Sequence, residues 1–276
     1  MTTRNAFVVG WPVAHSRSPL IHRFWLKRHS IDGDYRAEAV PPDAIDGFLA
    51  SLRHRGYCGG NVTLPYKEAA FRACRSLTPV ARCLEVVNTL WLEGSALYGD
   101  NTDAFGFVAN LDDNVNDWRG GANALVLGAG GASRAVVHAL IEAGYGSIDL
   151  LNRTPARAAA LAGHFGAGVR PGGLDAIPQR LPNADIIINA TSTGLGGDAG
   201  LRIDWSLARS GAIATDLVYV PLVTPFLSAA AESGLRIVDG LGMLLHQAVP
   251  GFERWFGVRP EVDAELRELL IGDLQG

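Results

Sequence analysis

A buried strand, a glycine turn and a helix follow one another in residues 124–140, and this order restricts the fold more than any other feature. Ala124–Leu127 are four apolar residues without alternation, which is typical of a strand covered on both faces of a parallel sheet. Gly128 and Gly130 permit a tight turn and bring backbone N–H groups close to a diphosphate at the start of the helix. We therefore predict a dinucleotide-binding α/β domain, with loop contacts from Gly128, Ala129, Gly130, Gly131 and Ala132.

A glycine turn between a strand and a helix also occurs without any ligand. The neighbouring residues must therefore decide whether this turn binds a dinucleotide. Ser133 stands where dinucleotide-binding turns usually have a third Gly or Ala. The next predicted strand, Ser147–Leu151, is followed by Asn152, Arg153 and Thr154 instead of the acid that binds the ribose 2′-hydroxyl of NAD.

Two arginines near the end of that second strand favour a phosphorylated ribose. Arg153 and Arg157 could bracket a 2′-phosphate, because a guanidinium group matches phosphate oxygens in a fork geometry. Thr154 is expected to cap the following helix, with Pro155 at its first position. An exposed helix charge is the alternative for Arg157, and Asp149, in mid-strand, is expected to be structural. These residues predict NADP(H) as the cofactor.

Composition excludes several classes of protein. The chain has 276 residues, 48% of them hydrophobic and 19% charged, which indicates one large or two medium globular domains. Its net charge is −4 without a cluster of Lys and Arg, so neither nucleic acid nor an anionic membrane is an expected partner. Three cysteines without a CxxC pair are expected to be thiols in a reducing cytoplasm. No apolar run is long enough to span a membrane, and the seven histidines form no metal pattern.

Two serines follow the first predicted strand, Ala6–Gly10. Ser18 precedes Pro19 and is expected to cap a helix that runs to about His29. The hydroxyls of Ser16 and Ser18 are spaced so that both could converge on one small anion near that helix start. For Ser18, capping alone is an equally good explanation.

A lysine and an aspartate stand at two further helix starts. A short strand should end at Thr63, with Pro65 in the first turn of a helix over 66–74, which places Lys67 where the helix dipole disfavours a cation. Such a position suggests acid–base work, although a solvated lysine is the alternative. Asp103 opens a helix to Leu111 that Thr102 could cap, and a favourable dipole explains it equally well. A shared role requires Asp103 to face Lys67, which spacing alone cannot show.

Several motifs occur in an order and spacing that together are highly specific. They are His15–Pro19, Asn61–Lys67, Val87–Thr89, Gly99–Asp103, the glycine loop, and Asp239–Gln247. On these motifs the chain resembles the shikimate dehydrogenase family over nearly its whole length. The resemblance implies an α/β substrate domain, residues 1–105 joined by C-terminal helices in 243–276, and an NADP-binding Rossmann domain, residues 106–242, with the active site in the cleft between them.

The resemblance also implies roles for individual residues. Lys67 and Asp103 would form the catalytic pair, and Ser16 and Ser18 would bind the substrate carboxylate. Asn61, Thr63, Asn88 and Gln247 would contact the ring hydroxyls or organise the groups that do. Tyr219 would lie near the carboxylate and the nicotinamide, although packing at a strand end explains it nearly as well. Further cofactor contacts would come from Asn152, Thr191, Ser192, Leu217 and Gly240. Val86 and Ala104 depart from the family pattern beside the site.

The expected activity is the reversible, NADPH-dependent reduction of 3-dehydroshikimate to shikimate. A quinate/shikimate dehydrogenase that uses NAD, a preference for aminoshikimate, and a protein that senses NADP(H) without turnover are the alternatives. The sequence does not distinguish a monomer from a homodimer.

Overall fold

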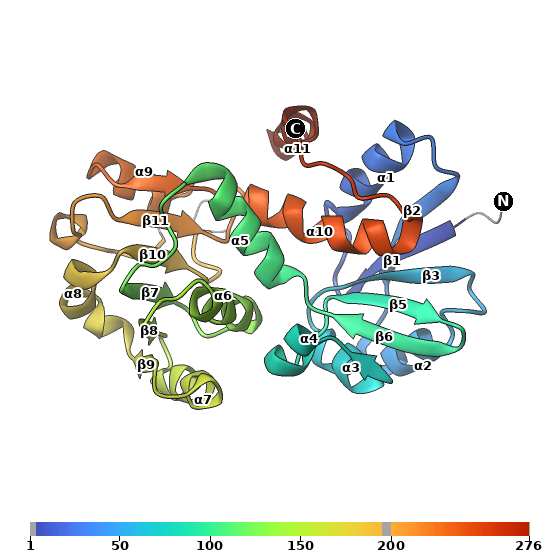
Figure 1. Cartoon of the computed structure of the whole chain (residues 1–276), viewed down its shortest axis with the longest axis horizontal. Coiled ribbons are helices and arrows are strands. Elements are labelled where there is room, and N and C mark those ends of the chain that lie inside the picture. The colour runs from blue at the N-terminus through green and yellow to red at the C-terminus, as the bar shows by residue number, and fades with distance from the viewer. Residues whose placement is uncertain (1–3, 195–199, 276) are drawn as a thin grey trace. The chain divides into compact units, whose positions relative to one another are not determined.

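The computed structural model describes residues 4–194 and 200–275, which pack as two compact units. The first unit contains the described residues up to Asp103 and those from Leu245 onward, and the second runs from Ala104 to Leu244. Helix α5 (Asp103–Asn114) carries the chain out of the first unit, and helix α10 (Leu241–Phe256) carries it back. Figure 1 labels most of the helices and strands of both units.

The first unit is built on a six-stranded mixed sheet in the order β2-β1-β3-β5-β6-β4. β1 pairs in parallel with both β2 and β3, whereas β3–β5 and β5–β6 are antiparallel. β5 and β6 therefore form an antiparallel hairpin. The strands are β1 (Arg4–Gly10), β2 (Gly33–Ala39), β3 (Tyr57–Val62), β4 (Ser76–Leu77), β5 (Thr89–Glu93) and β6 (Ala96–Asp100).

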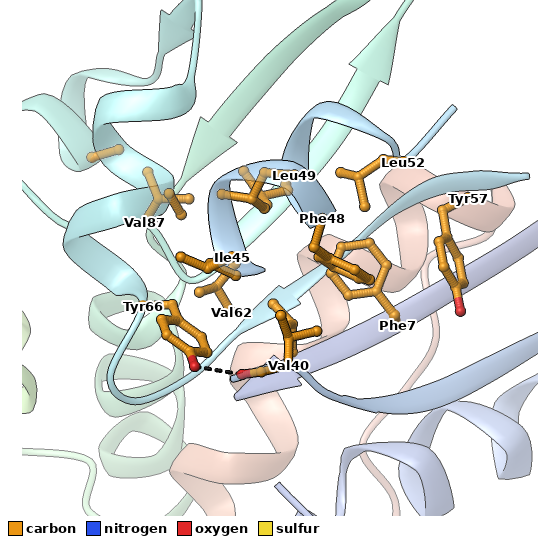
Figure 2. Close-up of a cluster of buried hydrophobic side chains, with 14 residues drawn as sticks. Phe7, Val40, Ile45, Phe48, Leu49, Leu52, Tyr57, Val62, Tyr66 and Val87 are labelled. Atoms are coloured by element: carbon orange, nitrogen blue, oxygen red, sulfur yellow. Dashed lines mark hydrogen bonds between the residues drawn. The ribbon is translucent and has the colours of Figure 1, made fainter. Parts of the chain in front are cut away.

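Helices pack apolar side chains against both faces of this sheet. On one face, Phe7 of β1 lies 5.2 Å from Phe48 and 4.9 Å from Tyr57 between ring centroids, in the cluster shown in Figure 2. On the other, Trp25 of α1 lies 5.3 Å from Phe252 of α10. The other helices of this unit are α1 (Ser18–Arg28), η1 (Pro42–Ala44), α2 (Ile45–Ala50), α3 (Lys67–Ala73), α4 (Pro79–Leu84) and α11 (Ala264–Gln275).

Two local predictions for this unit were wrong. Ser18 is the first residue of α1 and not its cap, since Arg17 holds the cap position without a side-chain hydrogen bond. Pro65 lies before α3, in a turn with a cis peptide bond, and Tyr66 takes the N-cap position. Strand β5 begins at Thr89, and the backbone N–H groups of Val87 and Asn88 just before it donate to the backbone oxygens of Lys67 and Asp100.

The second unit contains a six-stranded sheet in which every pair is parallel. Its order is β12-β11-β10-β7-β8-β9, so that the first strand, β7, lies inside and the chain winds outward in both directions. This is the Rossmann order expected for dinucleotide-binding domains. The strands are β7 (Asn123–Leu127), β8 (Ser147–Leu151), β9 (Val169–Gly172), β10 (Ile186–Asn189), β11 (Ile213–Asp216) and β12 (Arg236–Val238).

The prediction of a buried strand before the glycine turn is confirmed, because residues 124–127 are at most 1% exposed. Helix α6 (Gly131–Glu142) follows the turn at once, as expected. Strand β9 and helix α8 were not predicted. The remaining helices are α7 (Pro155–Phe165), η2 (Leu174–Ala176), α8 (Ile177–Arg180), η3 (Leu181–Asn183), η5 (Trp205–Leu207) and α9 (Pro225–Glu232). Within the described ranges, no helix combines the length and apolar character needed to cross a membrane.

Candidate active site

The structure brings Lys67 and Asp103 together. Lys67 Nζ donates to Asp103 Oδ2 at 2.5 Å, and the two side chains are only 18% and 11% exposed. Each residue opens a helix, α3 for Lys67 and α5 for Asp103. The positive end of a helix dipole favours Asp103 and opposes Lys67, and the ion pair offsets that cost for the lysine. The pair is thus an ammonium and a carboxylate held in direct contact with limited access to water.

Asn88 orients the carboxylate of this pair. Its Nδ2 donates to Asp103 Oδ1 at 2.8 Å, so both oxygens of Asp103 are engaged. The same amide nitrogen lies 3.5 Å from Gln247 Oε1 on α10. Asn88 Oδ1 in turn accepts from the backbone N–H of Thr102 at 2.9 Å and from the Thr89 hydroxyl at 2.8 Å. With 3% of its surface exposed, Asn88 acts as an internal brace.

Asn61 is also buried, and its side chain is hydrogen-bonded to other residues of the protein. Its Nδ2 donates to the backbone oxygen of Asn88 at 3.1 Å and to Thr89 Oγ1 at 3.2 Å. Its Oδ1 accepts from the Tyr35 hydroxyl at 2.6 Å. Because these bonds use both amide hydrogens, Asn61 organises its neighbours in this structure.

The predicted carboxylate-binding serines lie at the start of α1. Ser16 Oγ accepts from the backbone N–H of Ser18 at 3.4 Å, and Ser18 is buried whereas Ser16 is half-buried. Thr63 is half-buried just beyond β3. A Cβ at Gly10 would come within 2.5 Å of the Thr63 methyl group, so a glycine is needed there for Thr63 to lie as it does.

Four residues that sequence reasoning did not assign to the site complete its hydrogen bonds. Thr89 bridges Asn61 and Asn88, and Tyr35 supports Asn61. Asn101 Oδ1 accepts from the Asp103 backbone N–H at 3.0 Å, and the Thr102 hydroxyl donates to the backbone oxygen of residue 247 at 2.8 Å. Asn101 and Thr102 stood inside a recognised motif, which was a usable signal, but nothing in the sequence linked Tyr35 to the site.

The glycine turn of the second unit is shaped for close backbone approach. Gly128 has φ +111°, and a Cβ there would lie 2.8 Å from the carbonyl carbon and oxygen of Ala190. Ala129 N–H donates to Asn152 Oδ1 at 3.1 Å, which ties the turn to the end of β8. A Cβ at Gly130 or Gly131 would meet no atom within 4 Å, so the backbone at the α6 N-terminus borders open space. These features fit a bound diphosphate.

Ser133, the departure from the usual third glycine, has a local explanation. Its hydroxyl accepts from the Gly130 backbone N–H at 3.1 Å, and the side chain is fully buried. The buried serine therefore holds the turn through this hydrogen bond, and the space beside Gly130 and Gly131 stays open.

The end of β8 presents two cations. Arg153 and Arg157 are exposed, and no carboxylate partner is recorded for either among the described residues. Thr154 occupies the N-cap position of α7 beside Pro155, but its side chain makes no capping bond, which corrects that prediction. The expectation for Asp149 is confirmed, since it pairs with Arg170 at 2.7 Å.

A hydrogen-bonded cluster joins the loops that follow β10 and β11. Asn189 Oδ1 accepts from the Thr191 N–H at 3.1 Å and from its hydroxyl at 2.7 Å, and Asn189 Nδ2 donates to Asp216 Oδ2 at 3.0 Å. Asp216 also accepts from the Thr224 hydroxyl at 2.7 Å and from the Val218 N–H at 2.9 Å. Burial raises the pKa of the Asp216 carboxyl, against the effect of these donors.

The predicted cofactor residues of these loops differ in exposure. Ser192 is exposed, Thr191, Leu217 and Tyr219 are half-buried, and Gly240 is buried. A Cβ at Gly240 would lie 2.6 Å from the backbone oxygen of Asp216, so close packing explains this glycine without a ligand. In the part of the chain that the structure describes, no three His, Cys, Asp or Glu side chains gather as metal ligands would.

The fold and site define a two-domain dehydrogenase with a Rossmann unit and a separate unit that carries a buried lysine–aspartate ion pair. Residues 8–90 match the shikimate dehydrogenase substrate binding domain, residues 112–195 the shikimate/quinate 5-dehydrogenase domain, and residues 240–270 the shikimate 5′-dehydrogenase C-terminal domain. The chain belongs to the shikimate dehydrogenase family.

Individual relatives agree with this assignment. The NADP(+) shikimate dehydrogenase of Brucella melitensis biotype 2 is 54% identical over 98% of this chain and 95% of its own length. The corresponding enzyme of Mesorhizobium japonicum is 53% identical over 99% and 97%. Shikimate 5-dehydrogenase from Thermus thermophilus, solved with NADP(H) and shikimate, superposes with a TM-score of 0.87 at 39% identity, covering 99% of this chain and 100% of that one. Quinate dehydrogenase from Corynebacterium glutamicum, solved with NAD, gives 0.90 at 27% identity, covering 98% and 99%.

Proposed function

We propose that this protein catalyses the reversible NADPH-dependent reduction of 3-dehydroshikimate to shikimate. The observation that carries the proposal is the 2.5 Å contact between Lys67 and Asp103, braced by Asn88. NADP(H), when bound, takes up or supplies the hydride. The protein must then align the substrate and move one proton at the reacting oxygen.

Lys67 is the group that we assign to that proton. In reduction its ammonium donates a proton to the oxygen of the former carbonyl, and in oxidation its amine accepts the hydroxyl proton. Asp103 holds the ammonium in place through Oδ2, and Asn88 holds Asp103 through Oδ1. Ser16 and Ser18 are proposed to bind the substrate carboxylate, and Thr63, Gln247 and Tyr219 to contact the substrate.

NADP(H) is proposed to bind on the glycine turn, with its 2′-phosphate between Arg153 and Arg157. The open space beside Gly130 and Gly131 supports the diphosphate position. The two exposed guanidinium groups support the phosphate position, because neither is recorded with a carboxylate partner in residues 4–194 or 200–275. Asn152, Thr154, Thr191, Ser192 and Leu217 are proposed to complete the cofactor contacts.

The test of the catalytic pair compares Lys67→Ala with Lys27→Ala, which removes an exposed lysine from α1. Absorbance at 340 nm follows the oxidation of shikimate by NADP⁺. We expect kcat of Lys67→Ala to fall roughly 10²- to 10⁴-fold, as is usual for loss of a general acid–base group, and kcat of Lys27→Ala to stay normal. A near-normal kcat in Lys67→Ala would remove the proton-transfer assignment.

Quinate oxidation with NAD⁺ is a second candidate, favoured by the fold similarity to the quinate dehydrogenase. Measuring kcat/KM for shikimate and quinate with each cofactor distinguishes the two activities. A strong preference for NAD⁺ would contradict the proposed role of Arg153 and Arg157.

A cytoplasmic location is proposed as well. Burial raises the pKa of the Cys58 thiol to about 11 and that of the Cys74 thiol to about 12. Such thiols stay protonated and unreactive near neutral pH, as suits structural cysteines in a reducing compartment. Fractionation of the native host tests this location.

A further inference from the structure

Tyr35 is a fully buried tyrosine with one polar group held in a fixed direction. It lies on β2, and its hydroxyl donates to Asn61 Oδ1 at 2.6 Å. Its ring stacks on His22 of α1, with centroids 4.0 Å apart and planes 13° from parallel, and Trp255 of α10 lies 5.9 Å away. Both ring nitrogens of His22 lack a hydrogen-bond partner in the described part of the chain. The Tyr35 ring is therefore fixed by packing, and its hydroxyl has little freedom to turn elsewhere.

Hydrogen bonds run without a break from Tyr35 to the proposed catalytic lysine. Asn61 Nδ2 donates to the Asn88 backbone oxygen at 3.1 Å, and Asn88 Nδ2 donates to Asp103 Oδ1 at 2.8 Å. Asp103 Oδ2 then accepts from Lys67 at 2.5 Å. All of these residues belong to the first unit.

We propose that Tyr35 is a positioning residue for the substrate site, acting by holding the Asn61 amide in one orientation. The proposal rests on the assignment of Lys67 and Asp103 as the catalytic pair. If the Asn61 amide turned over, its oxygen would face the backbone oxygen of Asn88, and two acceptors would be opposed without a hydrogen between them. The Asn88 oxygen, which can only accept, selects the observed orientation. In that orientation the Tyr35 hydroxyl donates to Asn61 Oδ1 and so holds the other end of the amide in place.

The surroundings of the hydroxyl support this role. Burial raises the pKa of Tyr35 well above its usual value, and the Ser18 hydroxyl beside it acts in the opposite direction. Tyr35 therefore remains a donor throughout the pH range of an assay. Its hydroxyl lies beside Asn61 of β3 and beside Ser18 of α1, which is proposed to bind the substrate carboxylate.

The test compares Tyr35→Phe with Tyr57→Phe, a matched change of a second buried tyrosine on the same sheet. The Tyr57 hydroxyl donates to Glu38, away from the site. For Tyr35→Phe we expect kcat/KM for shikimate to fall about tenfold, since a buried acceptor loses its partner. The KM for NADP⁺ should stay unchanged, and Tyr57→Phe should keep all kinetic constants. A kcat/KM within about twofold of wild type, or an equal loss in Tyr57→Phe, would overturn the proposal.

A double-mutant cycle checks that Tyr35 acts through Asn61. Tyr35→Phe combined with Asn61→Ala should be no more impaired than Asn61→Ala alone, whereas fully additive losses would contradict the proposal. The experiments distinguish a failure of the Tyr35 proposal from a failure of the proposed catalytic pair. A loss in Tyr35→Phe beside a normal Lys67→Ala would disprove the pair, and the reverse result would disprove the positioning role.

Discussion

At the scale of single residues, the charges of this protein separate into paired and unpaired groups. Lys67 is paired with Asp103, and Arg170 with Asp149, so their positions are fixed by contacts within one unit. Arg153 and Arg157 are exposed without a recorded partner in the described ranges, at the end of the strand where a dinucleotide ribose lies in this fold. Exposed charges of this kind add little to stability, so replacing them tests the proposed phosphate site without endangering the fold.

The arginines give a prediction about cofactor choice. In the double variant Arg153→Ser/Arg157→Ser we expect the KM for NADP⁺ to rise about 10- to 100-fold, because a charged hydrogen bond is worth roughly 1.5–3 kcal/mol. The KM for NAD⁺ should change little, since NAD⁺ has no 2′-phosphate. Steady-state kinetics with both cofactors measure this ratio. Arg180→Ser, on the same unit, serves as the control, and an unchanged NADP⁺ preference in the double variant would refute the phosphate site.

At the scale of elements, helix starts and strand ends position the residues proposed for function within each unit. Lys67 and Asp103 each open a helix, and Asn189 and Asp216 each end a strand. Sequence patterns located β8 (Ser147–Leu151) to the residue and the helix starts near Lys67 and Asp103 to within one residue. They missed local turn chemistry, as at Ser18 and Pro65, because caps depend on backbone angles that neighbouring segments impose.

The Asp216 cluster gives a prediction at this scale. Asp216→Asn would direct an amide N–H₂ group toward an existing donor in either orientation. One side of the carboxylate faces Asn189 Nδ2 and the Thr224 hydroxyl, and the other faces the Val218 N–H. The loops after β10 and β11 should then lose their common anchor, and we expect the KM for NADP⁺ to rise roughly tenfold, as for a buried unsatisfied group. Asp149→Asn, a second buried aspartate on the same sheet, should lower stability without changing the KM. Equal kinetic effects in both variants would mean that Asp216 is only structural.

At the scale of the whole molecule, the burial of His22 makes the free energy of unfolding depend on pH. Burial lowers the pKa of His22 to about 3, although the Asn61 side chain acts in the opposite direction. The unfolded chain has a His pKa of about 6.5. Protons therefore bind the unfolded state first as the pH falls, so this contribution to stability is complete above about pH 6.5 and declines between about 6.5 and 3.

The linkage predicts a measurable difference between variants. Between about pH 7.5 and about pH 5, the unfolding free energy of the wild type should fall by about 2 kcal/mol because of His22. The His22→Phe variant should not show this part of the decrease. Urea denaturation at the two pH values measures the difference. Replacement of the exposed His54 by Gln is the matched control for the loss of a histidine. Parallel pH profiles for wild type and His22→Phe would show that His22 is not the titrating group.

Local patterns along the chain were enough to predict the parallel sheet around Ala124–Leu127, the glycine turn, the family and the residue types of the site. Such patterns report burial, backbone freedom and charge over a few neighbouring positions. The meeting of Lys67 with Asp103, the bracing by Asn61 and Asn88, and the support from Tyr35 became visible only in the folded chain. These hydrogen bonds join residues 15 to 36 positions apart, and only the folded sheet brings such positions within reach of one another.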